Sequence, residues 1–252
     1  MSTDAPLIPW PHLGLPRPRV AAEWWSTRDR GQWPAPPAGE GRPAVVVPGF
    51  LAGDGSVTRL AAWLREGGYR TVPSGLSPNT DCLEPTVAAL RTRLERVVAE
   101  HGRPALLVGQ SRGGSVGRAL AVLHPELVDT LVCLGSPLTD QLAVHPRTWA
   151  SIGTVGALGS AGVPRMFSFR CLRGDCCSRA RAALTAPFPA TVGFISLYSR
   201  SDEVVRWQAC LDPAATCVEV DSSHVGMAFD RSVWTALAEA LAGPAALVAA
   251  SR

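Results

Sequence analysis

The 252-residue chain is 46% hydrophobic and 18% charged, so it has enough apolar side chains for one sizeable core, which favours a single α/β domain. It contains no uninterrupted apolar stretch of about 18 residues and no basic segment leading into an apolar one near its start, so we expect a cytoplasmic protein without stable membrane insertion. The 24 basic residues are all arginine, exceed the 21 acidic residues only slightly and are spread along the chain. Because nucleic-acid binding needs clustered positive charge, no nucleic-acid partner is expected.

The first 43 residues are rich in proline and tryptophan. Within them only Ala21 to Arg30 has the composition of a short helix, and the following P-A-P-P-A-G-E-G-R-P is typical of a turn-rich connection. Because tryptophan side chains rarely stay in water, we expect residues 1–43 to form an arm packed over a domain made by residues 44–252.

From residue 44 onwards, strand patterns and helix patterns alternate. The expected strands are Ala44–Val47, Tyr69–Val72, Pro104–Gly109, Val128–Leu134, Val192–Tyr198 and Thr216–Val220. The first of them is a continuous apolar run, as in a parallel sheet covered on both faces. The expected helices have apolar residues at helical spacing and span Ser56–Glu66, Glu84–Glu100, Gly113–Leu123 and Arg231–Ala242. Short links between such elements imply right-handed crossovers, and hence an α/β fold with a doubly wound, mostly parallel sheet.

The alternation stops between about residues 138 and 188. An insertion of this length between two strands is expected to form a cap over the edge of the sheet that carries the candidate site. It contains a run of small apolar residues, Ser151–Val163, which we interpret as a buried core helix, with a mobile lid as the alternative.

Five of the seven cysteines lie between Cys171 and Cys217. A zinc site needs paired ligands, usually completed by a second pair or by histidine, and the group Cys171, Cys176 and Cys177 has no matching half-site in the sequence. We therefore expect free thiols and no metal. A Cys210–Cys217 bridge, or one from Cys171 to either of its two neighbours, is the alternative.

The sequence G-Q-S-R-G-G at Gly109–Gly114 stands between an expected strand and an expected helix. This is the context of the G-x-S-x-G nucleophile elbow, in which a serine on a sharp, strained turn needs small neighbours. Such a turn places the serine hydroxyl at the edge of the sheet, beside the free N–H groups of a helix N-terminus. We predict Ser111 as a catalytic nucleophile; an ordinary glycine-rich turn is the alternative.

A serine nucleophile needs a base, which in this arrangement follows an acid along the chain. Three histidines follow Ser111. His224 comes directly after the last expected strand and is the predicted base, whereas His124 ends the helix after the serine and His145 stands at the start of the cap.

The predicted acid is Asp202, which follows the strand that ends at Tyr198. A carboxylate there can orient the imidazole and stabilise its charged form. Its neighbour Glu203 is the alternative acid and is expected to point elsewhere, and Asp221 is expected to cap its own loop.

Acyl transfer also needs two N–H donors for the oxyanion. One is expected to be the backbone N–H of Arg112, which follows the nucleophile. The other is expected from the P-G-F-L segment after the first strand, where the N–H of Phe50 is the first choice and that of Leu51 the second; Leu51 is also expected to line the substrate site. Gly49 lets the backbone turn there.

Five motifs stand in the order found in lipase-like α/β-hydrolases: P-G-F at Pro48–Phe50, G-Q-S-R-G-G at Gly109–Gly114, L-G-S-P at Leu134–Pro137, S-R-S-D-E-V-V at Ser199–Val205 and S-S-H-V-G-M at Ser222–Met227. From about residue 44 to its end the chain resembles bacterial members of that superfamily, including esterase/lipase and PGAP1-like groups. The resemblance implies the α/β-hydrolase fold and a Ser-Asp-His triad.

The sequence departs from this family at two positions. Pro48 stands where many lipases have histidine, and Arg112 stands where leucine, methionine or glutamine is common. The catalytic donor at Arg112 is a backbone N–H, so that role is unaffected. Its side chain is expected either to favour an anionic acyl group or to pair with a carboxylate of the cap.

These observations predict a serine hydrolase of the esterase/lipase type that cleaves a carboxylic ester through an acyl-enzyme, with no cofactor. The expected partner is a small-molecule ester or a lipid-like substrate. A thioesterase or acyltransferase with the same triad is the first alternative, and a non-catalytic binding protein with this fold is the second.

Overall fold

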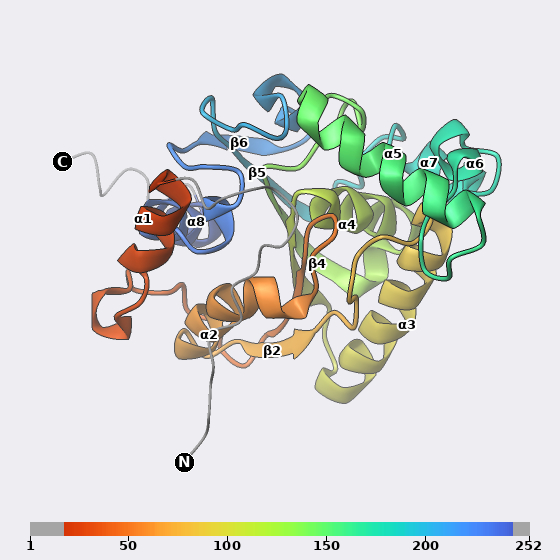
Figure 1. Ribbon diagram of the computed structural model, residues 1–252. Coiled ribbons are helices and arrows are strands. Elements are labelled where there is room, and N and C mark those ends of the chain that lie inside the picture. Colours follow the sequence, from red (N-terminus) through yellow and green to blue (C-terminus); the bar gives the residue numbers. More distant parts are fainter. Residues whose placement is uncertain (1–17, 244–252) are drawn as a thin grey trace, which may run out of the picture.

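The computed structural model describes residues 18–243, which form six parallel strands and the helices that cover them (Figure 1). In this part of the chain the strand order is β2-β1-β3-β4-β5-β6, so the sheet is doubly wound from β1. The strands are β1 (Pro43–Val47), β2 (Arg70–Pro73), β3 (Ala105–Gln110), β4 (Val128–Leu134), β5 (Gly193–Tyr198) and β6 (Thr216–Glu219).

Helices α2 and α8 cover one face of the sheet, and α3 and α4 cover the other (Figure 1). The predicted strands and helices of the sheet domain are present, with bounds that differ by one or two residues at most. The helices are α1 (Pro18–Ser26), α2 (Thr58–Glu66), α3 (Leu83–His101), α4 (Arg112–Leu123), α5 (Pro146–Ser160), α6 (Phe169–Arg173), α7 (Ser178–Ala183) and α8 (Arg231–Ala242).

The central strands are buried on both sides. In β1, Val45 and Val47 belong to the core under α3 and α4, whereas Ala44 and Val46 belong to the core under α2 and α8. Successive side chains of a strand point to opposite faces, so a strand between two helical layers must be apolar at every position. This explains the unbroken apolar runs in the sequence.

The described part of the arm packs on the core under α2 and α8. Its helix spans Pro18–Ser26, so the prediction of Ala21–Arg30 is wrong at both ends. Asp29 accepts from the N–H of Gly31 and begins a separate 3-10 turn after the helix. The ring of Trp33 meets that of Trp234 of α8 edge-on, with 5.2 Å between centroids. The first 17 residues of the predicted arm lie outside the described residues.

Between β4 and β5 the chain forms α5, α6 and α7. The interpretation of Ser151–Val163 as a buried core helix is wrong, because α5 lies at the surface, with Trp149 and Leu158 each 41% exposed. Its small residues have another purpose: a Cβ atom at Gly156 would meet the ring of Phe169 at 2.8 Å, so glycine allows α5 and α6 to pack closely. Helix α7 instead belongs to the core beside α3 and α4.

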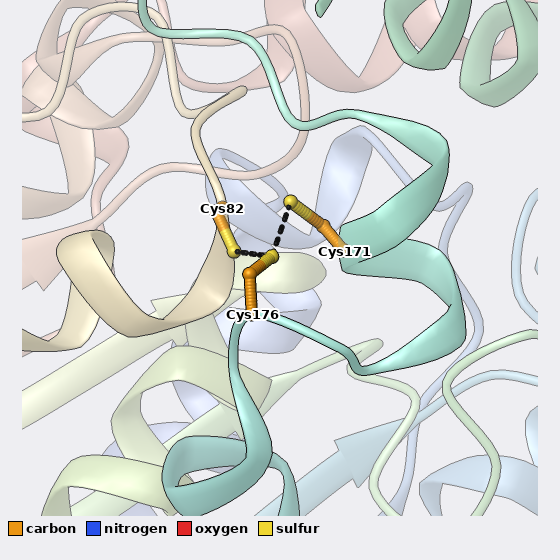
Figure 2. A group of neighbouring side chains, drawn as sticks. All are labelled: Cys82, Cys171 and Cys176. Carbon is orange, nitrogen blue, oxygen red and sulfur yellow. Dashed lines mark hydrogen bonds between the residues drawn. The ribbon is translucent and has the colours of Figure 1, made fainter. Parts of the chain in front are cut away.

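All seven cysteines are free, so neither the Cys210–Cys217 bridge nor a bridge from Cys171 to its neighbours is formed. The structure nevertheless gathers three thiols that are far apart in the sequence. Cys82, at the start of α3, lies beside Cys171 and Cys176 of the cap (Figure 2). No helix of residues 18–243 is long and apolar enough to cross a membrane.

Candidate active site

Ser111 occupies the turn between β3 and α4 with φ of 54° and ψ of −124°. A positive φ is strained for a residue with a side chain, and here the surroundings fix it. A Cβ atom at Gly109 would collide with the backbone of Gly114, and one at Gly113 would collide with the carbonyl of Val47. The glycines of the motif are therefore required because strand, turn and helix pass within contact distance of one another.

The structure brings the three predicted triad residues together. The Nε2 atom of His224 lies 2.9 Å from the Ser111 hydroxyl oxygen, and its Nδ1 atom lies 2.7 Å from Oδ2 of Asp202. The other carboxylate oxygen of Asp202 accepts from the N–H groups of Val204 and Val205, at 2.7 and 2.8 Å. All three triad side chains are buried, so each is held in one orientation.

The electrostatic environment of His224 favours its charged form. Burial acts to lower the pKa of this imidazole, but the charge and hydrogen bond of Asp202 and the charge of Glu203 outweigh it and raise the pKa above its ordinary value. An imidazole in these surroundings is well suited to receive a proton from the serine hydroxyl and to hold it.

Two other carboxylates, Glu203 and Asp221, lie on the loops around His224. Glu203 accepts from the backbone N–H of His224 at 3.2 Å, so it holds the loop while Asp202 holds the ring. Asp221 accepts from Arg19 at 2.6 Å and from the hydroxyl of Ser201 at 2.7 Å. The prediction that Asp221 caps its own loop is wrong, because its partners lie on α1 and on the loop after β5.

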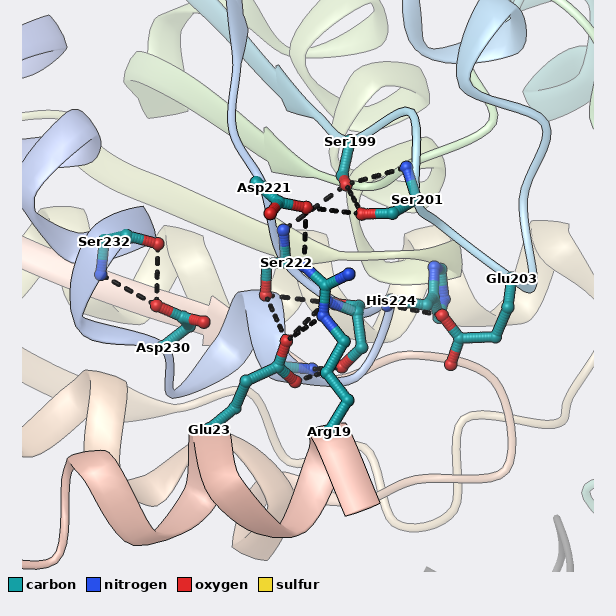
Figure 3. Close-up of polar contacts among 12 residues, drawn as sticks. Arg19, Glu23, Ser199, Ser201, Glu203, Asp221, Ser222, His224, Asp230 and Ser232 are labelled. Carbon is teal, nitrogen blue, oxygen red and sulfur yellow. Dashed lines mark hydrogen bonds and ion pairs between the residues drawn. The ribbon is translucent and has the colours of Figure 1, made fainter. Parts of the chain in front are cut away.

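The loop that carries His224 is held from below by helix α1 (Figure 3). Glu23 of this helix is buried and accepts from the N–H of Ser223 at 2.7 Å, from its hydroxyl, and from Arg19 at 3.0 Å. A Cβ atom at Gly226 would collide with this carboxylate, which explains the glycine in the S-S-H-V-G-M motif.

Sequence reasoning did not find Glu23. Its partners are about 200 residues away, and an acidic residue in a short helix next to tryptophans carries no signal of burial. On the opposite side of the loop, the side-chain amide of Gln110 donates to the carbonyl oxygen of His224 at 3.2 Å. The residue before the nucleophile therefore helps to hold the backbone of the predicted base.

The segment after β1 lies next to Ser111. A Cβ atom at Gly49 would come within 3.2 Å of the Ser111 side chain. Leu51 has φ of 64°, so the chain makes a sharp turn at this point. Phe50, Leu51 and Arg112, the residues predicted to supply oxyanion donors, line the same cavity as Ser111.

This cavity has a volume of about 410 Å³, which is in the range of small-molecule sites. Ser111 and His224 face it from the sheet domain, together with the apolar residues Phe50, Leu51, Val225 and Phe229. The segment between β4 and β5 supplies much of the rest, including Leu142, Val144, Ile152, Phe167 and Leu172. The site is thus a largely apolar chamber between the cap and the carboxyl edge of the sheet.

The side chain of Arg112 also reaches this chamber. It donates to the carbonyl oxygen of Asp81 at 2.5 Å, and its guanidinium lies 5.7 Å from the ring centroid of Phe167. Burial lowers the pKa of Arg112 to about 10, so the group stays cationic at neutral pH. The expected pairing with a cap carboxylate is wrong, because its partner is a backbone carbonyl of the sheet domain; the preference for an anionic acyl group stays a prediction.

No protein-family model matches the sequence, and no curated protein matches it. Solved structures do match, among them the mature lipase BlEst2 of Bacillus licheniformis, with a TM-score of 0.55 and 16% identity over 78% of this chain and 88% of that one. The metagenomic carboxyl esterase MGS0156 matches with a TM-score of 0.57 and 18% identity over 87% of this chain and 79% of that one. An extracellular α/β-hydrolase from a Paenibacillus species matches with a TM-score of 0.51 and 16% identity over 81% and 99% of the two chains.

The chain has the α/β-hydrolase fold. At this low identity the similarity to bacterial lipases and esterases establishes the fold and no more. In the α/β-hydrolase fold, chemistry is grouped at the carboxyl edge of the parallel strands. Here that edge brings together the turn after β3, the loop after β5 and the loop after β6, which carry Ser111, Asp202 and His224.

Proposed function

We propose that the protein is a serine hydrolase that cleaves small carboxylic esters, with Ser111 as nucleophile, His224 as base and Asp202 as acid. The observation that carries the proposal is the continuous hydrogen-bonded chain from Asp202 through His224 to Ser111, which ends at an apolar cavity. A buried serine, imidazole and carboxylate in this order match the requirements for activating a hydroxyl group.

In acylation, the Ser111 hydroxyl oxygen attacks the ester carbonyl while Nε2 of His224 takes the hydroxyl proton. The Asp202 carboxylate stabilises the resulting imidazolium and keeps Nδ1 protonated. The backbone N–H of Arg112, at the first position of α4, has no partner within that helix and is a proposed oxyanion donor. The N–H of Phe50 is the proposed second donor, with that of Leu51 as the alternative.

His224 then gives its proton to the leaving alcohol, and the acyl group stays on Ser111 as an ester. In deacylation a water molecule attacks this ester, again with His224 as base, and the acid is released. The cavity is lined mainly by apolar residues and is of moderate volume, so it suits the hydrocarbon part of a small or lipid-like ester.

The proposal is tested with a fluorophosphonate probe and with p-nitrophenyl esters of increasing acyl length, beside the matching thioesters. We expect labelling and ester hydrolysis by the wild type, and a fall in kcat of at least about 10⁴-fold in Ser111→Ala. The matched control is Ser178→Ala, at an exposed serine of α7, which should keep full activity. Equal labelling of wild type and Ser111→Ala, or none of either, would contradict the proposal.

A further inference from the structure

Three cysteine thiols meet where the cap joins the sheet domain (Figure 2). The sulfur of Cys176 lies 3.1 Å from that of Cys171 and 3.4 Å from that of Cys82, and all three lie within 4.8 Å of one another. Cys82 stands at the start of α3, Cys171 lies on α6, and Cys176 lies in the loop after it. The group therefore joins two parts of the chain that are 94 residues apart.

Contacts that do not involve sulfur hold these cysteines in place. Gly174, with φ of 91°, ends α6 in the left-handed conformation and turns the chain so that Cys176 returns towards Cys171. On the other side, the N–H of Phe167 donates to the carbonyl of Thr80 at 2.8 Å, just before Cys82. The three sulfur atoms are thus brought together by the fold itself.

The number and spacing of the thiols favour a metal ion over a disulfide. A disulfide would use two sulfur atoms and leave the third without a role, whereas a metal ion can bind all three. Thiolates bound to zinc at about 2.3 Å in a tetrahedron lie roughly 3.8 Å apart. The observed separations of 3.1 and 3.4 Å need to change by less than about 1 Å to reach this value.

The four residues between Cys171 and Cys176 also lie within the usual spacing of a zinc half-site, which spans two to four residues. The sequence alone does not reveal the remainder of the site, because Cys82 belongs to another element.

Polar groups beside the three thiols also suit a metal site. The N–H of Ser168 points at the sulfur of Cys171 at 3.4 Å, as expected for a group that supports a metal ligand. The cationic Arg112, bonded to the carbonyl next to Cys82, adds positive charge close to the thiols.

We propose that Cys82, Cys171 and Cys176 bind one Zn²⁺ ion and thereby fasten the cap to the loop before α3. Each thiol loses its proton when the metal binds, so the affinity for zinc rises with pH. Cys176 is exposed, which leaves room for a water molecule as the fourth ligand. The site is independent of the proposed ester hydrolysis, and the proposal departs from the expectation of free thiols without a metal.

The test uses the full-length protein, reduced and stripped of metal by a chelator, and titrated first with Co²⁺ and then with Zn²⁺. We expect one equivalent of Co²⁺ to give a thiolate-to-metal charge-transfer band, which one equivalent of Zn²⁺ abolishes. Replacement of Cys82, Cys171 or Cys176 by serine should weaken zinc binding at least about tenfold. The matched control is Cys217→Ser, at an exposed free thiol outside the group, and it should bind as the wild type does.

Cys176→Ser decides the matter if Cys82→Ser fails to fold, because Cys176 is exposed and its loss removes no buried packing. Ser111→Ala should bind zinc normally, which separates this proposal from that of ester hydrolysis. The proposal is overturned if the reduced protein gives no cobalt band, or if Cys176→Ser gives the wild-type band. It is also overturned if peptide mapping finds a native disulfide within the group and the protein takes up no metal after reduction.

Discussion

At the scale of single residues, Asp202 orients His224, the proposed base, and sets its charge. Its carboxylate bonds Nδ1 of His224 at 2.7 Å and contributes to raising the pKa of that imidazole against the effect of burial. The base works only when it is neutral, so activity should fall as the pH drops through this raised pKa. The acidic limb of the pH–rate profile is therefore expected at a higher pH than that of an unperturbed histidine, whose pKa is about 6.5.

The variant Asp202→Asn removes this charge. Burial of His224 then dominates, its pKa falls, and the acidic limb of kcat/KM moves to lower pH. We also expect kcat to fall by about 10⁴-fold, because an amide no longer fixes the correct tautomer. Ester hydrolysis measured across the pH range checks both effects. The comparison variant Glu203→Gln leaves the bond between Asp202 and Nδ1 of His224 in place, so its kcat should fall far less. Equal losses of kcat in the two variants would show that Asp202 is not the acid.

At the scale of elements, helix α1 has a specific task, because Glu23 holds the loop of His224 from outside the sheet domain. A buried carboxylate that accepts several hydrogen bonds fixes the groups around it. Glu23→Gln removes the negative charge and turns one of the two oxygens that accept from Ser223 into an NH₂ donor. We expect kcat to fall by about 10- to 100-fold with KM nearly unchanged, because even a small shift of this loop misplaces His224 relative to the Ser111 hydroxyl.

The rate of fluorophosphonate labelling provides a second measure, because it reports how well His224 activates Ser111 without substrate binding in the cap. Asp221→Asn is the matched control: it weakens an exposed contact of the same helix, to Arg19, and should change kcat little. If Glu23→Gln lowers only the thermal stability and leaves both rates unchanged, then Glu23 stabilises the fold without positioning the base.

The elements that local patterns determine could be predicted, and those that depend on distant partners could not. Strands such as β3 and helices such as α4 follow from apolar runs and from the glycines around Ser111, so the fold and the candidate triad were accessible from the sequence. Helix α5 was misjudged because small apolar residues are typical both of a buried helix and of two surface helices in close contact, and only Phe169 distinguishes the two cases. Nothing in the sequence around Cys82 indicates that it joins Cys171 and Cys176, because 94 residues separate it from Cys176.

At the scale of the whole molecule, a buried ion pair connects three parts of the described chain. Arg118 of α4 bonds Asp212, which lies between β5 and β6, at 2.8 Å, and both side chains are 6% exposed. The same guanidinium donates to the carbonyl oxygens of Ala183 and Ala186, where the segment between β4 and β5 returns to the sheet. The guanidinium of Arg118 therefore connects α4, the end of the cap and the segment between β5 and β6.

Arg118→Met should lower the free energy of unfolding by about 3–5 kcal/mol, because it leaves the Asp212 carboxylate buried without its counter-charge. Urea unfolding measures this loss. The double variant Arg118→Met/Asp212→Asn should recover part of it, since no uncompensated charge stays in the core. The control Arg91→Met removes an exposed pair with Glu95 on α3 and should cost less than about 1 kcal/mol. Equal losses of stability in Arg118→Met and Arg91→Met would mean that the buried pair does not join these elements. The cap would then be held by its apolar contacts and by the three cysteines Cys82, Cys171 and Cys176.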